Sequence, residues 1–60
     1  MMRYAVLMSD ETIAAIRGVT SCDQSHTRLA SAHKEAARIR RVAGTEGAHV
    51  WDRRERVFVR

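Results

Sequence analysis

The sequence predicts a single small α+β domain over residues 1–60, in which an N-terminal strand and a C-terminal hairpin form a small sheet packed on one long helix and one short helix. Three observations predict this class: an unbroken apolar run near the N-terminus, a helical apolar repeat in the middle, and alternating apolar residues near the C-terminus. A chain of 60 residues holds one domain at most and buries only about 60% of its unfolded surface. We therefore expect a thin core, and self-association that buries more surface.

The stretch RYAVLM, residues 3–8, predicts the first strand. Its two alternating sets are both apolar: Tyr4, Val6 and Met8 face one way, and Ala5 and Leu7 face the other. This pattern is typical of a strand that is covered on both faces. We expect either a central strand or a strand at an interface.

The stretch SDETIAAIRG, residues 9–18, predicts a short helix. Ser9 is a favourable N-cap, Asp10 and Glu11 suit the positive end of the helix dipole, and Gly18 suits the C-cap. The alternative is a hairpin that turns at residues 9–11 and continues as a strand over TIAAI. That turn lacks the Gly or Asn that tight hairpins prefer.

The stretch VTSCDQS predicts a connection, after which Asp23 or Ser25 caps a long helix over residues 25–43. Gly44 and Gly47 end this helix. One apolar stripe recurs at helical spacing: Leu29, Ala32, Ala36, Ile39 and Ala43. A different face of the helix carries the cations Lys34, Arg38 and Arg41.

The last stretch, AHVWDRRERVFVR, predicts two strands joined by a polar turn near residues 52–55. Val57 and Val59 share one face of the last strand, and Arg56, Phe58 and Arg60 share the other. The order is therefore strand, helix, helix, strand, strand. We expect the Leu29/Ile39 stripe of the long helix to pack on the two valines, so that the opposite sheet face stays open.

The net charge of +4 lies entirely in residues 31–60, which hold eight bases and four acids. Such a half is compatible with polyanion binding and also with a simple solvated surface. Arginines and aromatics on an open sheet face suit either a protein interface or single-stranded nucleic acid. The candidate binding residues on that face are Trp51, Arg53, Arg54, Arg56, Phe58 and Arg60, and those on the helix are Lys34, Arg38 and Arg41.

The residue patterns argue against catalysis, cofactors and metals. Cys22, His26, His33 and His49 match no zinc-ligand spacing. Asp23, Ser25 and His26 are adjacent, whereas a hydrolytic triad converges from separate segments. The three glycines form no phosphate-binding loop. We expect a protein that is not an enzyme and takes no cofactor or metal.

The single cysteine favours a reducing, cytoplasmic setting, because it has no partner for a disulfide within the chain. The longest apolar runs fall far short of the roughly 20 residues of a membrane span. We therefore expect no membrane contact.

Two resemblances add to this interpretation. The stretches RYAVLMSDE, HKEAARIRRVAG and AHVWDRRERVFV resemble small α/β proteins of actinobacteriophage genomes. That resemblance implies a small accessory protein made in a host cytoplasm, and it assigns no functional residue.

The stretch RYAVLMSDETIAAI is similar to the ribbon-helix-helix class of DNA-binding repressors, in its order of strand, capped helix and second helix. In that class strands pair between two chains and present alternate residues to the major groove. The resemblance implies that one of two sets faces DNA: Arg3, Ala5 and Leu7, or Tyr4, Val6 and Met8. Residues 48–60 extend beyond the pattern of that class.

The interpretation that the sequence favours is a small, non-catalytic accessory or modulator protein that acts by binding another protein and self-associates. The first resemblance implies that it is phage-encoded. The alternative is a basic nucleic-acid-binding module. Protein binding predicts dependence on Trp51 and Phe58 more than on charge, whereas nucleic-acid binding predicts a steep loss of affinity with salt.

Overall fold

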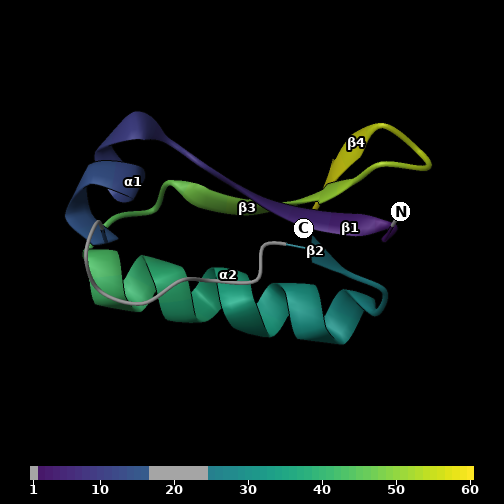
Figure 1. The fold of residues 1–60 in the computed structure, drawn as a ribbon, viewed down its shortest axis with the longest axis horizontal. Coiled ribbons are helices and arrows are strands. Elements are labelled where there is room, and N and C mark those ends of the chain that lie inside the picture. The colour runs from purple at the N-terminus through teal and green to yellow at the C-terminus, as the bar shows by residue number, and fades with distance from the viewer. Residues whose placement is uncertain (1, 17–24) are drawn as a thin grey trace.

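The computed structural model describes residues 2–16 and 25–60 and confirms the α+β class (Figure 1). Its elements, in chain order, are β1 (Tyr4–Met8), α1 (Asp10–Ile16), β2 (Ser25–His26), α2 (Leu29–Ala43), β3 (Ala48–Asp52) and β4 (Val57–Val59). The predicted order had no strand between the helices, so β2 is an addition to it. The first strand, the short helix and the C-terminal hairpin lie where the sequence predicts them, and the long helix ends at the predicted residue.

The strands form one antiparallel sheet in the order β2-β1-β3-β4. Since β2 and β3 both run antiparallel to β1, they are parallel to each other, and α2 connects them across β1. This is a split β-α-β unit. It makes β1 one of the two inner strands, and a central strand is one of the two expected positions for a strand with two apolar sets.

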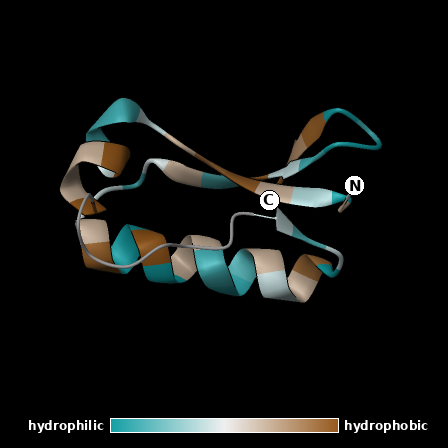
Figure 2. Ribbon diagram, viewed as in Figure 1, coloured by the Kyte–Doolittle hydropathy of each residue, from teal (hydrophilic) through white to brown (hydrophobic). Residues whose placement is uncertain are grey.

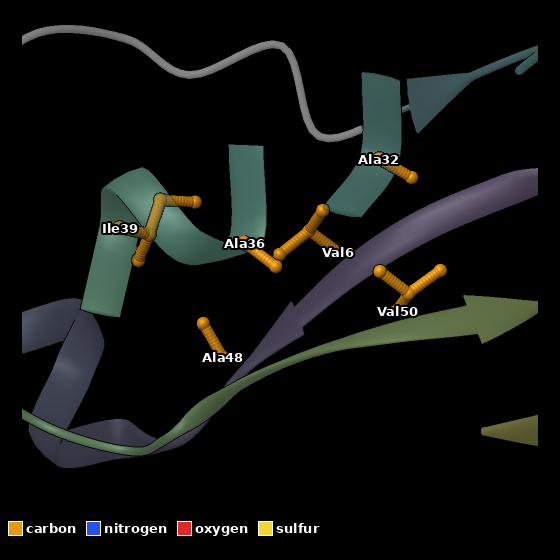
Figure 3. Packing of buried hydrophobic residues seen from close by; sticks show 6 residues of the cluster. All are labelled: Val6, Ala32, Ala36, Ile39, Ala48 and Val50. Carbon is orange, nitrogen blue, oxygen red and sulfur yellow. The ribbon is translucent and has the colours of Figure 1, made fainter. Parts of the chain in front are cut away.

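The core lies between α2 and one face of the sheet (Figure 3). It consists of Val6 from β1, Ala48 and Val50 from β3, and three α2 residues, Ala32, Ala36 and Ile39. The three helix residues belong to the predicted apolar stripe, which is confirmed. Alanines let the helix approach the sheet closely but bury little area, so the core is thin, as expected for a chain of this length.

The long helix begins at Leu29, four residues later than predicted. Ser25 and His26 instead pair with Ala5 and Tyr4 of β1. These backbone bonds to the edge of the sheet replace the bonds of a first helical turn, so Ser25 is not the cap. The other predicted cap, Asp23, lies outside the described residues.

Gly44 ends the long helix as predicted. Its φ of 69° is left-handed, and its N–H donates to the carbonyl of Arg40 at 2.9 Å. Only glycine adopts this conformation without strain from a Cβ atom.

The stretch after β1 is a helix rather than the alternative hairpin. The backbone N–H of Thr12 donates to Ser9 Oγ at 3.3 Å, which is the predicted N-cap contact. Asp10 and Glu11 lie in the first turn. The predicted C-cap at Gly18 lies outside the described residues.

A hydroxyl cluster joins α1 to the start of β3. The Ser9 N–H donates to the Gly47 carbonyl at 2.8 Å, and Ser9 Oγ lies 2.9 Å from the fully buried Thr12 hydroxyl. Thr12 is also hydrogen-bonded to the hydroxyl of Thr45. A Cβ on Gly47 would lie 2.5 Å from Thr12 Oγ1 and 2.9 Å from Ser9 Cβ. Gly47 therefore allows α1 to lie close to the start of β3, and it does not end the long helix as the sequence predicts.

Two predictions of burial are met only in part. On the second face of β1, Ala5 is 4% exposed but Leu7 is 44% exposed, so the single chain covers only part of that face. Val59 packs on the core, but Val57 is 51% exposed and does not. Val57 pairs with Asp52 at the start of the edge strand β4, beside the turn.

Candidate functional site

The sheet face opposite α2, which we call the open face, has no helix over it within the described residues (Figure 1). Directly opposed residues of antiparallel strands point the same way, so the register assigns the side chains of this face. They are Ala5, Leu7, Ser25, His49, Trp51 and Phe58. None of these side chains is a carboxylate.

Three rings form a cluster on the open face. The Trp51 and Phe58 rings meet edge to face, with centroids 4.9 Å apart and planes at 70°. His49 meets Phe58 in the same manner, with centroids 6.2 Å apart. Phe58 is 57% exposed, whereas Trp51 is half-buried. The two aromatic residues predicted for a binding face are therefore in contact, and Phe58 presents the larger free surface.

Arg53 extends the open face beyond Trp51. Its guanidinium donates to the Met2 carbonyl at 2.7 Å and to Ser25 Oγ at 3.2 Å. Because Ser25 stands on β2, the side chain of Arg53 reaches across the end of β1. Arg53 is one of the predicted binding residues. Its two hydrogen bonds fix a positive charge at one end of the ring cluster.

The turn between β3 and β4 is organised by Asp52. Its Oδ1 accepts the N–H of Arg54 at 2.9 Å and that of Glu55 at 3.3 Å, and its carbonyl accepts the N–H of Arg56 at 2.8 Å. Arg56 has a φ of 57°, so the side-chain alternation predicted for residues 56–60 holds only from β4 onward.

The carboxylate of Asp52 is also paired with Arg3, whose Nη2 lies 3.0 Å from Oδ2. The hydrogen bond from Arg3 and those from the N–H groups of Glu55 and Arg54 lower the pKa of Asp52, against the opposing effect of burial. This pair ties the turn to the start of β1.

The predicted Arg54 and Arg56 are exposed on the turn, which Figure 2 shows as a hydrophilic loop beside the hydrophobic β4. Arg54 shares a shallow depression of about 370 Å³ with Met2, Arg3 and Arg53. The arginines therefore gather at the turn end of the ring cluster, while Arg60 stands at its other end, after β4.

The structure does not bring the predicted helix cations to the open face. α2 packs on the opposite side of the sheet (Figure 1). Helical periodicity directs Lys34 and Arg41 away from the buried stripe, and both are exposed. Arg38 is half-buried on the same helix. Any ligand on the open face therefore misses these three residues.

A cleft of about 360 Å³ opens between α2 and the edge of the sheet. It is lined by His33, Arg40, His49, Val50, Phe58, Val59 and Arg60. Arg40 is held there because its Nη1 donates to the Ala48 carbonyl at 2.6 Å. The sequence interpretation did not name this cleft. The available signal was the seven-residue spacing of His33 and Arg40, which places both on one flank of a helix.

The described histidines are separated rather than clustered. His26 Nε2 lies 3.0 Å from Glu35 Oε1, between β2 and α2, while His33 and His49 line the cleft. Within residues 2–16 and 25–60, no group of three His, Cys, Asp or Glu side chains is placed to hold a metal ion. Cys22 lies outside these residues.

The ribbon-helix-helix resemblance implies that β1 pairs with the same strand of a second chain. Such pairing needs a free edge on β1, and β1 has none. β1 pairs with β2 on one side and with β3 on the other, within one chain. No helix among the described residues is long and apolar enough to cross a membrane. Comparison of the chain with family models, curated proteins and solved structures gave no match.

Proposed function

We propose that this chain is a non-catalytic binding module whose open face binds single-stranded nucleic acid. The observation that carries the proposal is the ring cluster of His49, Trp51 and Phe58 on an exposed sheet face, with arginines at both ends. Rings offer surfaces on which bases stack, and arginines neutralise phosphates.

Stacking on this face requires a ring that is exposed and held in place. Phe58 meets both conditions, since it is 57% exposed and contacts two neighbouring rings. A ring fixed in this way loses little conformational entropy when a base stacks on it. Phe58 is therefore the residue on which we expect binding to depend most.

Electrostatics favour an anionic ligand over a second copy of the chain. The side chains of the open face include no carboxylate, and Arg53 and Arg60 stand at its ends. A second copy stacked on this face would bring like charges together. A strand of nucleic acid running along β3 would instead place phosphates near both arginines, over roughly 17 Å at about 3.4 Å per residue.

A protein partner is the second candidate function. The observation in its favour is the exposed apolar surface of Leu7, at 44%, and Phe58, at 57%. An acidic protein surface would satisfy the same arginines. Such binding would depend on Phe58 but much less steeply on salt.

Self-association is a further expectation, supported by the thin core. Among the described residues, four of the seven buried apolar residues are alanine. A cytoplasmic setting, expected from the single cysteine, accords with a nucleic-acid ligand.

The test is a titration with single-stranded DNA, duplex DNA and RNA at about 50 and about 200 mM salt, conditions between which phosphate binders lose much affinity. Trp51 fluorescence reports binding, and light scattering reports the mass. We expect single strands to quench Trp51, with a log–log salt slope of about −0.7 per phosphate neutralised. An unchanged signal with every nucleic acid would refute the proposal and direct the search to protein partners.

A matched pair of variants locates the contact. Phe58→Ala removes the stacking ring, and we expect affinity for single strands to fall about 5-fold to 100-fold. Val57→Ala is the control, because Val57 has a similar exposure of 51% but points to the other face of the same strand. Equal losses from both variants would contradict stacking on the open face.

A further inference from the structure

The cleft between α2 and β4 gathers basic side chains from three elements. His33 and Arg40 come from α2, His49 from β3, and Arg60 follows β4. No Asp or Glu side chain lines the cleft among the residues that the structure describes. Its volume of about 360 Å³ lies within the range of about 300–1,000 Å³ that is typical of small-ligand sites.

Within the residues that the structure describes, the two arginines of the cleft lack the acid partners that other basic groups have. Arg3 is paired with Asp52, and His26 lies against Glu35. Among the described residues, the guanidinium of Arg40 makes one hydrogen bond, to the Ala48 carbonyl, which orients it while leaving donors for a ligand. Within the described part of the chain, Arg60 has no ion pair. No acidic side chain that the structure describes in the cleft therefore neutralises these two arginines, and the guanidinium of Arg40 is held in position.

We propose that this cleft binds the phosphomonoester group of a nucleotide at the end of a single strand. This proposal rests on the proposed nucleic-acid function. Arginine is always cationic and binds phosphate oxygens through paired N–H donors. Two arginines balance the double negative charge of a terminal phosphate, whereas a phosphate within a strand carries a single charge.

Phe58 connects the two sites. Its ring lines the cleft and also belongs to the ring cluster of the open face. A strand end with its phosphate between Arg40 and Arg60 therefore stacks its first base on Phe58. The rest of the strand follows β3 past Trp51 to Arg53 at the turn end.

The experiment compares one oligonucleotide with a 5′-phosphate, with a 3′-phosphate and with hydroxyls at both ends. Adenosine monophosphate and inorganic phosphate are titrated separately, to distinguish a strand end from a free phosphate. Since a charged hydrogen-bonded contact changes affinity by about tenfold or more, we expect one phosphorylated end to bind at least about tenfold more tightly than the hydroxyl form.

The variants are Arg60→Gln and the control Arg41→Gln. Both remove one positive charge, but Arg41 is exposed on the helix surface that faces away from the sheet. Arg60→Gln should abolish the preference for a phosphorylated end, and Arg41→Gln should keep it. Arg60 makes none of the hydrogen bonds found among the described residues, so its loss leaves the fold intact; circular dichroism checks this.

Oligonucleotide binding without any preference for a phosphorylated end would overturn the cleft proposal and leave the proposed function in place. A second outcome is that adenosine monophosphate or inorganic phosphate binds, that Arg60→Gln abolishes this binding, and that no oligonucleotide binds. This outcome would support a phosphate site in the cleft, but it would overturn the strand end as its ligand and the proposed function with it. Equal effects of Arg60→Gln and Arg41→Gln would reduce the site to general electrostatic attraction and overturn it.

Discussion

Gly47→Ala is the substitution whose effect on stability follows most directly from the structure. A Cβ at this position would meet Ser9 Oγ, Thr12 Oγ1 at 2.5 Å and Ser9 Cβ at 2.9 Å. Thr12 is fully buried and hydrogen-bonded to Thr45, so it has little room to move. The added methyl group therefore displaces α1 from the start of β3.

The magnitude combines two effects. Overpacking in a filled site costs about 1–3 kcal/mol, and loss of the N-cap contact of Ser9 costs about 1 kcal/mol more. A core of this size supplies no more than about 3–5 kcal/mol in total. Gly47→Ala should therefore remove most of the free energy of unfolding.

Gly44→Ala is the matched comparison, because nothing lies within 4 Å of a Cβ at Gly44. Its cost comes only from the left-handed φ of 69° and is about 1 kcal/mol. For a domain of this size, that corresponds to a fall in Tm of about 4–8 °C. Thermal and urea unfolding, followed by Trp51 fluorescence and circular dichroism, measures both variants.

A second-site change tests the named contact. Ser9→Gly removes both Ser9 atoms that face the new Cβ. By itself it costs a few tenths of a kcal/mol at the N-cap and also one partner of the buried Thr12 hydroxyl, but the displaced α1 of Gly47→Ala has already lost these contacts. The double variant should be more stable than Gly47→Ala alone. If Gly47→Ala unfolds at the same temperature as Gly44→Ala, the close approach of α1 to β3 is not as described.

Further predictions concern the core, the turn and the hydroxyl cluster. Ile39→Ala should lower the free energy of unfolding by about 2–5 kcal/mol, because the side chain is 1% exposed. Urea unfolding should find this variant largely unfolded. A loss below about 1 kcal/mol would contradict the place of Ile39 in the core. The lowered pKa of Asp52 stabilises the fold above the ordinary aspartate value of about 3.9, and this contribution is lost as pH falls through the folded value. Acid titration of stability should therefore be flatter for Asp52→Asn, and parallel curves would argue against the Arg3 pair. Thr45→Val leaves the buried Thr12 hydroxyl without one partner and should cost about 1–3 kcal/mol, whereas an unchanged Tm would discount that bond.

Local patterns predicted the parts of the fold that depend on neighbours in sequence. The stripe of Ala32, Ala36 and Ile39, the left-handed Gly44 and the N-cap at Ser9 each follow from periodicity or capping, which act over a few residues. The contact of Trp51 with Phe58 is also local, because a hairpin turn brings them opposite each other. These features needed no knowledge of the rest of the chain.

The start of α2 could not be predicted in the same way. Ser25 and His26 are a strand only because the edge of β1, some twenty residues earlier in sequence, accepts them as a partner. The exposure of Val57 also depends on distant residues, since only the packing of other elements decides which residues of β4 are covered. Pairing and coverage of this kind join residues far apart in sequence, and no window of local pattern contains them.

The sequence by itself determined the α+β class, the apolar stripe of the long helix, and the rings and arginines of the C-terminal hairpin. Tertiary structure alone decided the close approach at Gly47, the pairing of Asp52 with Arg3, and the meeting of His33, Arg40 and Arg60 in one cleft. The physical reason is range: propensity, capping and hairpin register act between near neighbours, whereas a cleft requires separate elements to pack at one distance and angle. The basic residues of the cleft are visible in the sequence, but their convergence exists only in the folded chain.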